Sequence, residues 1–281
     1  MAISNNIMAY STVSLINAAG SIAANDKRLS ICLKPNGFSF SLIAANTLYM
    51  VGEAEGTPSG TLTDVANDIK SYFGSLGIVS IDLKEAELVV PVATFTWVPD
   101  EVYTAVDDRN YLTLTGAEIG FEHVYTCHSD ILGAQLVFAS VDSLITPFKI
   151  ALPGIKVCCQ YNKTVNTQLA TQCGDGNLAL LNLRDGYADL TAYRKGKLEL
   201  CRTFASANVD QLLFQTLETV KLFTLESDTF CLLLCGEADR DIYATLRPYF
   251  ASVALYTGRK LTFATDEFRS LHTYRHALTL C

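Results

Sequence analysis

The chain has 281 residues, of which 49% are hydrophobic and 18% are charged, and 29 Asp and Glu outnumber 21 Lys and Arg, giving a net charge of −8. This composition can build a sizeable core in one large or two medium domains and excludes wholesale disorder. The acidic balance disfavours a non-specific nucleic-acid binder, which needs clustered basic residues, and an anionic membrane surface as partner.

Residues 1–25 contain no Lys or Arg, and polar residues interrupt their apolar ones. A secretory signal needs a basic start and a continuous apolar core, which this segment lacks. No apolar run reaches the roughly 18 residues that a membrane-spanning helix needs. We therefore expect a cytoplasmic protein without membrane insertion.

Residues 29–73 predict three strands and an amphipathic helix. The first two β-rich runs are separated by a Pro-Asn-Gly turn, as in a hairpin, and the third follows a turn that contains asparagine. A loop rich in Gly, Pro and Ser comes next, and apolar residues then recur with helical spacing. Thr61, with Asp64 three residues later, is a candidate helix start. The strands are expected at 29–33, 38–43 and 48–51, and the helix at 62–73.

Residues 178–223 predict the same order of elements. An Asp-Gly turn and then a Lys-Gly turn separate three β-rich runs. Asn208 and Gln211 have the spacing of a capping box at the start of the helix that follows. The strands are expected at 178–183, 187–193 and 198–204, and the helix at 209–220.

Spacing connects the two units. Leu29 precedes Gly37 by eight residues, and Leu178 precedes Gly186 by eight. The third strand begins eleven residues after the first glycine and twelve after the second, and each helix begins its apolar face about 23–25 residues after its glycine. We interpret the agreement of three strands, two turns and a helix as a structural duplication.

The remaining segments predict further strands and helices. Residues 88–97 form a continuous apolar run, which is typical of a buried central strand, and residues 230–235 form another. Residues 98–134 give a weaker pattern, with a helix expected near 100–107. The other expected strands are 135–139, 155–160, 252–256 and 261–264, and the other helices are 140–152, 241–250 and 266–280.

The nine cysteines are an odd number and lie mostly in apolar runs, as small buried hydrophobes do. Cys231 and Cys235 share one face of a predicted strand about 13 Å apart, too far for a disulfide. No Cys-x-x-Cys pair provides the usual zinc spacing. We expect reduced thiols and assign no metal site.

Three antiparallel strands followed by helix, strand, helix and strand, present twice, resemble the actin-like ATPase fold. In that fold two ribonuclease H-like lobes face a nucleotide cleft. Residues 178–202 are similar to the phosphate-loop hairpin of bacterial actin-like proteins in pilus assembly and cell division. Residues 29–42 resemble an uncharacterised Bacteroidetes family assigned the same fold. The resemblance implies an α/β protein with mixed sheets and two ribonuclease H-like lobes, placed at 1–160 and 161–281, with the C-terminal helix packing back on the first.

The positions that bind nucleotide in that fold are changed here. The family's phosphate loop reads Asp-x-Gly, where Asp positions metal and water and Gly lets the backbone approach the phosphate. Asn182 and Arg184 stand at these positions in the second unit, and Leu33 and Pro35 in the first. None supplies the carboxylate that a hard cation prefers, which also argues against a two-metal nuclease. The family's adenosine-binding Gly-Gly pair is reduced to Gly236, which also suits a tight turn between strand and helix.

Other candidate sites have simpler interpretations. His272 and His276 lie four residues apart on the predicted terminal helix, but no glutamate lies between them as in zinc proteases, so we expect exposed helix histidines. The glycine-rich segment 174–177 precedes a strand, whereas a phosphate cradle opens a helix, so we interpret it as a linker between lobes. We assign no metal to His123 and His128.

The sequence therefore predicts a non-catalytic actin-like protein that acts as a cytosolic binding or scaffolding module for a protein partner, with no cofactor and with a homodimer left open. The alternative is a diverged nucleotide-binding protein or ATPase using ATP and Mg²⁺, with Asn182, Asp185, Gly186 and Gly236 near the phosphates or adenosine. A nucleic-acid partner rests on fold analogy alone and is disfavoured by the charge. The decisive observation is whether the cleft between the lobes is open or filled by side chains.

Overall fold

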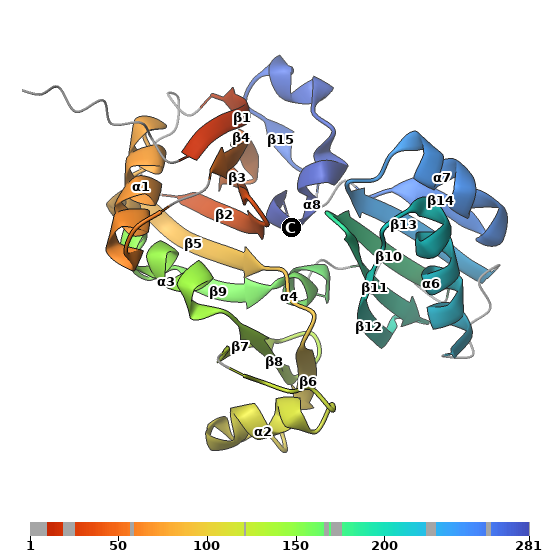
Figure 1. The fold of residues 1–281 in the computed structure, drawn as a ribbon. Coiled ribbons are helices and arrows are strands. Elements are labelled where there is room, and N and C mark those ends of the chain that lie inside the picture. The colour runs from red at the N-terminus through yellow and green to blue at the C-terminus, as the bar shows by residue number, and fades with distance from the viewer. Residues whose placement is uncertain are drawn as a thin grey trace, which may run out of the picture.

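The computed structural model describes residues 10–18, 26–56, 59–120, 122–165, 169, 176–222, 229–256 and 260–280. Within these ranges the strands form a seven-stranded first sheet, a five-stranded second sheet and a three-stranded small sheet. Figure 1 shows the first and second sheets side by side, with the small sheet below the first. Helices cover the outer sides of the two large sheets, and α4 (Gln160–Val165) and α8 (Ala277–Leu280) lie between them.

The first sheet has the strand order β1-β4-β3-β2-β5-β9, with β15 added in parallel beside β4. Strands β2, β3 and β4 pair antiparallel, whereas β5 runs parallel to β2 and β9 parallel to β5. The helices α1 and α3 pack against each other and cover one face (Figure 1). The elements are β1 Tyr10–Asn17, β2 Lys27–Lys34, β3 Gly37–Ala44, β4 Thr47–Gly56, α1 Leu62–Ser75, the short 3-10 helix Ser80–Asp82, β5 Leu83–Val90, α3 Asp142–Ala151, β9 Lys156–Cys159 and β15 Thr262–Phe263.

The second sheet has the order β12-β11-β10-β13-β14. Its first three strands are antiparallel neighbours, and β13 and β14 run parallel to β10. The helices α6 and α7 pack on its outer face, so that the alternate apolar residues of β10 and β11 are buried beneath them. The elements are β10 Asn177–Arg184, β11 Tyr187–Arg194, β12 Lys197–Ala205, α6 Val209–Leu222, β13 Phe230–Gly236, α7 Arg240–Leu246, the 3-10 helix Arg247–Tyr249 and β14 Ser252–Leu255.

Local signals explain why both three-stranded units and their helices were predictable. Ala45 and Asn46 both have positive φ in the two-residue turn between β3 and β4, which matches the twist of a hairpin. Thr61 and Asp64 form a capping box, with the Thr61 hydroxyl accepting from the Asp64 N–H at 3.3 Å. Asn208 Oδ1 accepts from the backbone N–H of Gln211 at 2.8 Å at the start of α6.

The predicted strand over residues 88–97 is wrong as a single element. β5 ends at Val90, and a separate strand, β6 (Phe95–Pro99), belongs to the small sheet. Pro91 has no N–H for a ladder. The side chain of Gln160 forms hydrogen bonds with both backbone groups of Val92. It accepts from the N–H at 2.9 Å and donates to the carbonyl oxygen at 2.6 Å. The chain can therefore leave the first sheet without losing buried hydrogen bonds.

The small sheet has the order β6-β8-β7. Strand β7 and the end of β6 come from residues 98–134, where the sequence pattern is weaker. The helix expected near 100–107 begins later than predicted, because the Thr104 hydroxyl donates to Asp107 Oδ2 at 2.8 Å and closes a turn first. The elements are the 3-10 helix Ala105–Asp107, α2 Asp108–Thr113, β7 His123–Ser129, β8 Ala134–Ser140 and α4 Gln160–Val165.

The predicted terminal helix over 266–280 is broken into three pieces. Leu271 has an extended backbone and His272 is also not helical, so the chain bends between Phe268 and the final helix. The pieces are the 3-10 helices Asp266–Ser270 and Thr273–His276 and the helix α8 Ala277–Leu280.

Three further observations bear on the expectations from sequence. Strand β1 at the edge of the first sheet was not predicted. All seven described cysteines are free thiols, and Cys173 and Cys281 lie outside the described residues. Within the described ranges, every helix is too short or too polar to cross a lipid bilayer.

Candidate functional site

The cleft between the first and second sheets is where both hairpin turns meet. A cavity of about 250 Å³ lies there, and several parts of the chain contribute to it, three of them with most of the lining residues. They are the turn after β2, the turn after β10 and the C-terminal residues 275–279. In the actin-like ATPase fold the nucleotide cleft lies between the two lobes. In this protein the two hairpins and the end of the chain together form the corresponding region.

The terminal segment, defined here as residues 273–280, lies between the two large sheets (Figure 1) and contacts strands of both. Ala277 packs on Leu178, Tyr193 and Cys235 of the second sheet. Leu278 packs on Cys32, Val89 and Cys158, and Leu280 on Ile43, Leu48 and Val51, all from the first sheet. The Ser41 hydroxyl on β3 donates to the carbonyl oxygen of Thr279 at 2.6 Å. The segment thus contacts both sheets with apolar and polar groups.

Strand register changes how the two hairpins correspond. Lys34 pairs with Gly37 in the first hairpin, and Arg184 pairs with Tyr187 in the second. Counted from the turns, the residues equivalent to Asn182 and Arg184 are Cys32 and Lys34, one position before those taken from the glycine spacing. The glycines themselves differ in place, since Gly37 opens β3 whereas Gly186 lies inside its turn. The corrected positions also lack a carboxylate.

Asp189, on β11, is the central hydrogen-bond acceptor of the second hairpin. Its side chain is 1% exposed and accepts hydrogen bonds from four side chains. Arg184 donates twice, from Nε to Oδ2 at 2.8 Å and from a terminal nitrogen to Oδ1 at 3.0 Å. The other donors are Asn182 Nδ2 at 3.1 Å, Thr203 Oγ1 at 2.7 Å and Gln160 Nε2 at 3.2 Å. Burial alone would lower the pKa of Arg184, but its bonds to Asp189 raise that pKa above the ordinary value.

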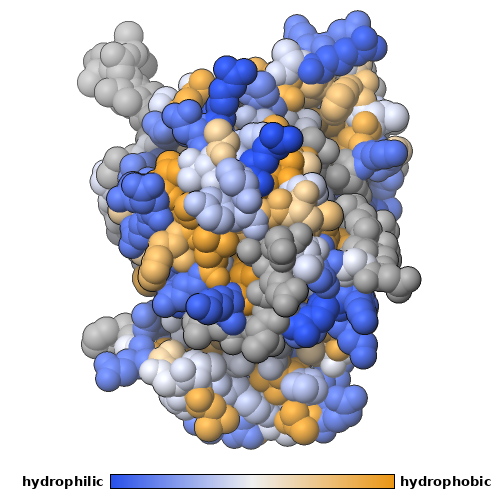
Figure 2. Space-filling view, turned by 90° about the vertical axis from the view of Figure 1, so that its right-hand side faces the viewer, coloured by the Kyte–Doolittle hydropathy of each residue, from blue (hydrophilic) through white to orange (hydrophobic). Residues whose placement is uncertain are grey.

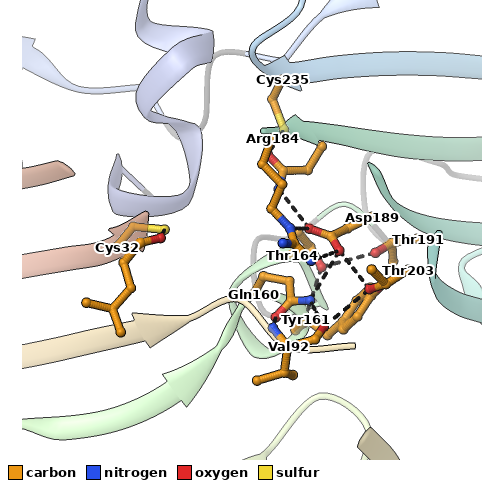
Figure 3. A network of polar contacts seen from close by, with 12 residues as sticks. Cys32, Val92, Gln160, Tyr161, Thr164, Arg184, Asp189, Thr191, Thr203 and Cys235 are labelled. Carbon is orange, nitrogen blue, oxygen red and sulfur yellow. Dashed lines mark hydrogen bonds and ion pairs between the residues drawn. The ribbon is translucent and has the colours of Figure 1, made fainter. Parts of the chain in front are cut away.

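The same network joins the two sheets (Figure 3). Gln160, at the start of α4, connects Val92 after β5 with Asp189 of the second sheet. Next to it the Tyr161 hydroxyl and Thr203 Oγ1 are 2.8 Å apart, and Thr164 and Thr191 hydroxyls are 3.1 Å apart. A buried polar network of this kind fixes one relative arrangement of the parts it connects, because an unpaired member would be costly.

The four residues named for the nucleotide-binding alternative lie in different surroundings. Asn182 is buried, and both ends of its amide are engaged, by Asp189 and by the Cys235 thiol at 3.4 Å. Asp185 is exposed in the turn at the edge of the cavity, and Gly186 is exposed beside it. Gly236 ends β13 against Asn182. The fold brings Asn182 and Gly236 together and leaves Gly186 outside the cavity lining.

Gly236 is required by packing. Its φ is +75°, and a Cβ at this position would lie 2.0 Å from the Leu183 carbonyl oxygen. The carbonyl already accepts from the Glu237 N–H at 2.8 Å, so it cannot move away freely. We expect Gly236→Ala to lower the free energy of unfolding by about 2–3 kcal/mol. Urea denaturation measures this, and Gly74→Ala, where a Cβ meets nothing within 4 Å, is the matched control. Equal stability of the two variants would contradict the packing role.

His276 is 7% exposed, so the expectation of an exposed helix histidine is wrong for this residue. Its Nδ1 is buried and has no hydrogen-bond partner within the described part of the chain. Burial lowers the pKa of His276 from 6.5 to about 4, with Glu53 opposing and Lys34 and Arg275 reinforcing the shift. The imidazole is thus neutral at pH 7.

The lowered pKa of His276 predicts a pH-dependent stability. The unfolded chain binds a proton at this residue near pH 6.5 and the folded chain only near pH 4. The free energy of unfolding should fall as the pH drops through this window, by up to about 3 kcal/mol. Urea denaturation between pH 7 and pH 4.5 should show a shallower fall for His276→Gln than for the wild type. His272→Gln, on the exposed side of the same bend, should keep the wild-type slope.

Three residues that organise this site were missed from sequence: Gln160, Asp189 and Thr203. Asp189 and Thr191 alternate with Ala188, Leu190 and Ala192 along β11, a pattern usually typical of a strand with one face in water. Here the polar face meets α4 instead. Among the described residues, no group of three or more His, Cys, Asp or Glu could hold a metal ion. Positions 174 and 175 of the glycine-rich linker lie outside the described residues.

Comparison with solved structures identifies the fold. A protein of unknown function with an actin-like ATPase fold from Bacteroides thetaiotaomicron is similar at 17% identity and a TM-score of 0.70, over 92% of this chain and 97% of that one. The PilM-PilN type IV pilus biogenesis complex is similar at 12% identity and a TM-score of 0.58, over 90% of this chain and 96% of the matched chain. The chain therefore has the actin-like ATPase fold, and the two large sheets with their helices are its ribonuclease H-like lobes.

The sequence also identifies the family. Residues 19–253 match the model described as protein of unknown function (DUF3822), and the chain belongs to this family. No curated protein matches it.

Proposed function

We propose that this protein is a non-catalytic member of the actin-like fold class that serves as a binding or scaffolding module for a protein partner. The observation that carries the proposal is the terminal segment in the cleft. Ala277, Leu278 and Leu280 are buried there against both lobes, in the space between the two hairpin turns. A nucleotide bound between the two turns would have to compete with these contacts.

The chemistry of the turns supports the same proposal. Triphosphate binding in a hairpin loop needs free backbone N–H groups and a carboxylate for the metal shell. Pro35 has no N–H, and the Arg184 guanidinium is held by Asp189 at 2.8 Å. Asp189 is the nearest carboxylate to Asn182, but its oxygens already accept five hydrogen bonds. We take the hairpins as structural elements that once had, and no longer have, the phosphate-loop pattern.

The organisation of the chain belongs to the proposal as well. We place the first lobe at residues 1–160 and the second at 161–281, with α8 packing back on the first, and we interpret the repeated units as a duplication. Strand β9 ends at Cys159 and β10 begins at Asn177, which supports a boundary between them. Reduced thiols and a net charge of −8 favour a cytoplasmic location.

A protein partner is favoured by large apolar side chains at the surface. Figure 2, which views the side where α6 and α7 lie in Figure 1, shows apolar patches interrupted by hydrophilic residues. Phe214 on α6 is 62% exposed there. On the small sheet side, Val106 and Leu114 are 91% and 83% exposed. Aromatic and aliphatic side chains in a polar surround are typical of protein contact surfaces.

Isothermal titration of the full chain with magnesium-ATP tests the proposal directly. We expect no binding heat above that of dilution, at protein concentrations where micromolar affinity would be evident. Clear micromolar binding would overturn the proposal and favour the nucleotide-binding alternative. In that event Asn182→Ala should weaken the binding, because Asn182 is the residue at the metal position of the second hairpin.

A further inference from the structure

The cavity that remains beside the terminal segment has the surroundings of a binding site. Its volume is about 250 Å³, and both lobes and the end of the chain line it. Most of its surface is apolar, and the lining includes Leu33, Pro35, Val90, Leu144, Leu183 and Leu278. Apolar walls with a few polar groups are typical of small-molecule pockets.

The polar group that stands out in this lining is His276. More than nine-tenths of the residue is buried, and its Nδ1 has no hydrogen-bond partner within the described ranges. His276 belongs to the cavity lining, so its imidazole is a polar group that a ligand in the cavity would meet. A neutral imidazole offers one acceptor and one N–H donor, and can therefore pair with a hydroxyl group.

The charges around the cavity disfavour an anion. Lys34 is paired with Glu53 at 3.0 Å, and Arg184 with Asp189 at 2.8 Å. Arg275 lines the same cavity as the carboxylates of Asp185 and Glu237. Three cationic and four anionic side chains therefore lie in or next to the cavity lining. A phosphate or carboxylate ligand would gain little net electrostatic attraction there.

The volume sets the size of the ligand. An apolar cavity of about 150 Å³ holds benzene, so this cavity has room for one ring and a few more atoms. A nucleoside triphosphate is several times too large.

We propose that this cavity binds a small uncharged alcohol or phenol, whose apolar body lies against the leucine-lined walls and whose hydroxyl pairs with His276. The site is independent of the proposed scaffolding function, because a ligand of this size leaves the terminal segment in place. It also differs from a nucleotide site in size, charge and the residues it uses.

Titration of the full chain with 4-fluorophenol, followed by ¹⁹F NMR, tests this inference. Fluorobenzene supplies the same ring without the hydroxyl, and 4-fluorobenzoate supplies an anion. We expect saturable binding of 4-fluorophenol about fivefold tighter than that of fluorobenzene, as one hydrogen bond would give. We expect 4-fluorobenzoate to bind more weakly than both.

Two variants locate the site. His276→Phe should reduce the affinity for 4-fluorophenol to that for fluorobenzene, whereas His272→Phe, outside the cavity lining, should leave both affinities unchanged. Leu144→Trp should abolish binding of both probes, because Leu144 lines the cavity yet is 54% exposed, so a larger ring there blocks the cavity without overpacking the core. The inference is overturned by absent saturation with 4-fluorophenol, by benzoate binding most tightly, or by unchanged affinity in both cavity variants.

Discussion

Asp189→Ala is expected to lower the free energy of unfolding by about 3–5 kcal/mol, the cost of removing one partner of a buried ion pair. The Asp189 carboxylate is almost fully buried and is the common acceptor for side chains from both lobes. Without it the Arg184 guanidinium loses both hydrogen bonds to its counter-charge. The amides of Asn182 and Gln160 each lose a hydrogen bond as well. Urea denaturation of the purified variant measures the change.

Asp185→Ala is the matched control for this experiment. Asp185 is an acidic residue of the same hairpin, but it is exposed, so its loss should change stability by no more than about 0.5 kcal/mol. Asp189→Asn should lie between the two, because it keeps one acceptor oxygen and the shape of the side chain. If the free energies of unfolding of Asp189→Ala and Asp185→Ala differ by less than about 1 kcal/mol, the network does not stabilise the fold as its geometry indicates.

The parts of the fold that could be predicted are those specified by neighbouring residues. The turn at Ala45 and Asn46, the capping box of Thr61 and Asp64 and the alternation along β10 and β11 are all encoded within a few positions. The strand expected over 88–97 was wrong for the opposite reason. Its interruption at Pro91 is tolerated because Gln160, 68 residues beyond Val92, replaces the lost ladder hydrogen bonds. A local pattern contains no information about such a distant partner.

The candidate site was harder to predict than the fold. Gly37 and Gly186 each follow the start of a predicted strand by eight residues, which suggested equivalent turns. The two glycines nevertheless have different structural roles. Gly37 allows close approach to the Ala54 carbonyl, where a Cβ would lie at 2.0 Å, whereas Gly186 has a positive φ inside its turn. The polar face of β11 had the same pattern as a solvent-facing one, and only its contact with α4 makes Asp189 a buried residue.

Deletion of residues 277–281 is expected to lower the free energy of unfolding by about 3–6 kcal/mol. Leu278 and Leu280 are 8% and 1% exposed, and full burial of one leucine side chain contributes about 1.5–3 kcal/mol. Ala277 and the hydrogen bond from Ser41 to the Thr279 carbonyl are lost as well. Urea denaturation measures the loss. Leu114→Ala, which removes an exposed leucine, should change stability by no more than about 0.5 kcal/mol.

The same deletion separates two reasons for which we expect no nucleotide binding. Burial raises the pKa of the Cys32 thiol to about 12 in the intact protein, and Leu278 belongs to the same buried cluster. Removing the segment should expose Cys32, lower its pKa and speed its reaction with Ellman's reagent at pH 8. Cys32→Ser should reduce this increase but not remove it, because Cys158 of the same cluster also becomes accessible. The opened cleft should still fail to bind magnesium-ATP, because the hairpins lack the metal carboxylate. Micromolar binding by the truncated chain alone would show that the terminal segment, and not the altered turns, keeps nucleotide out.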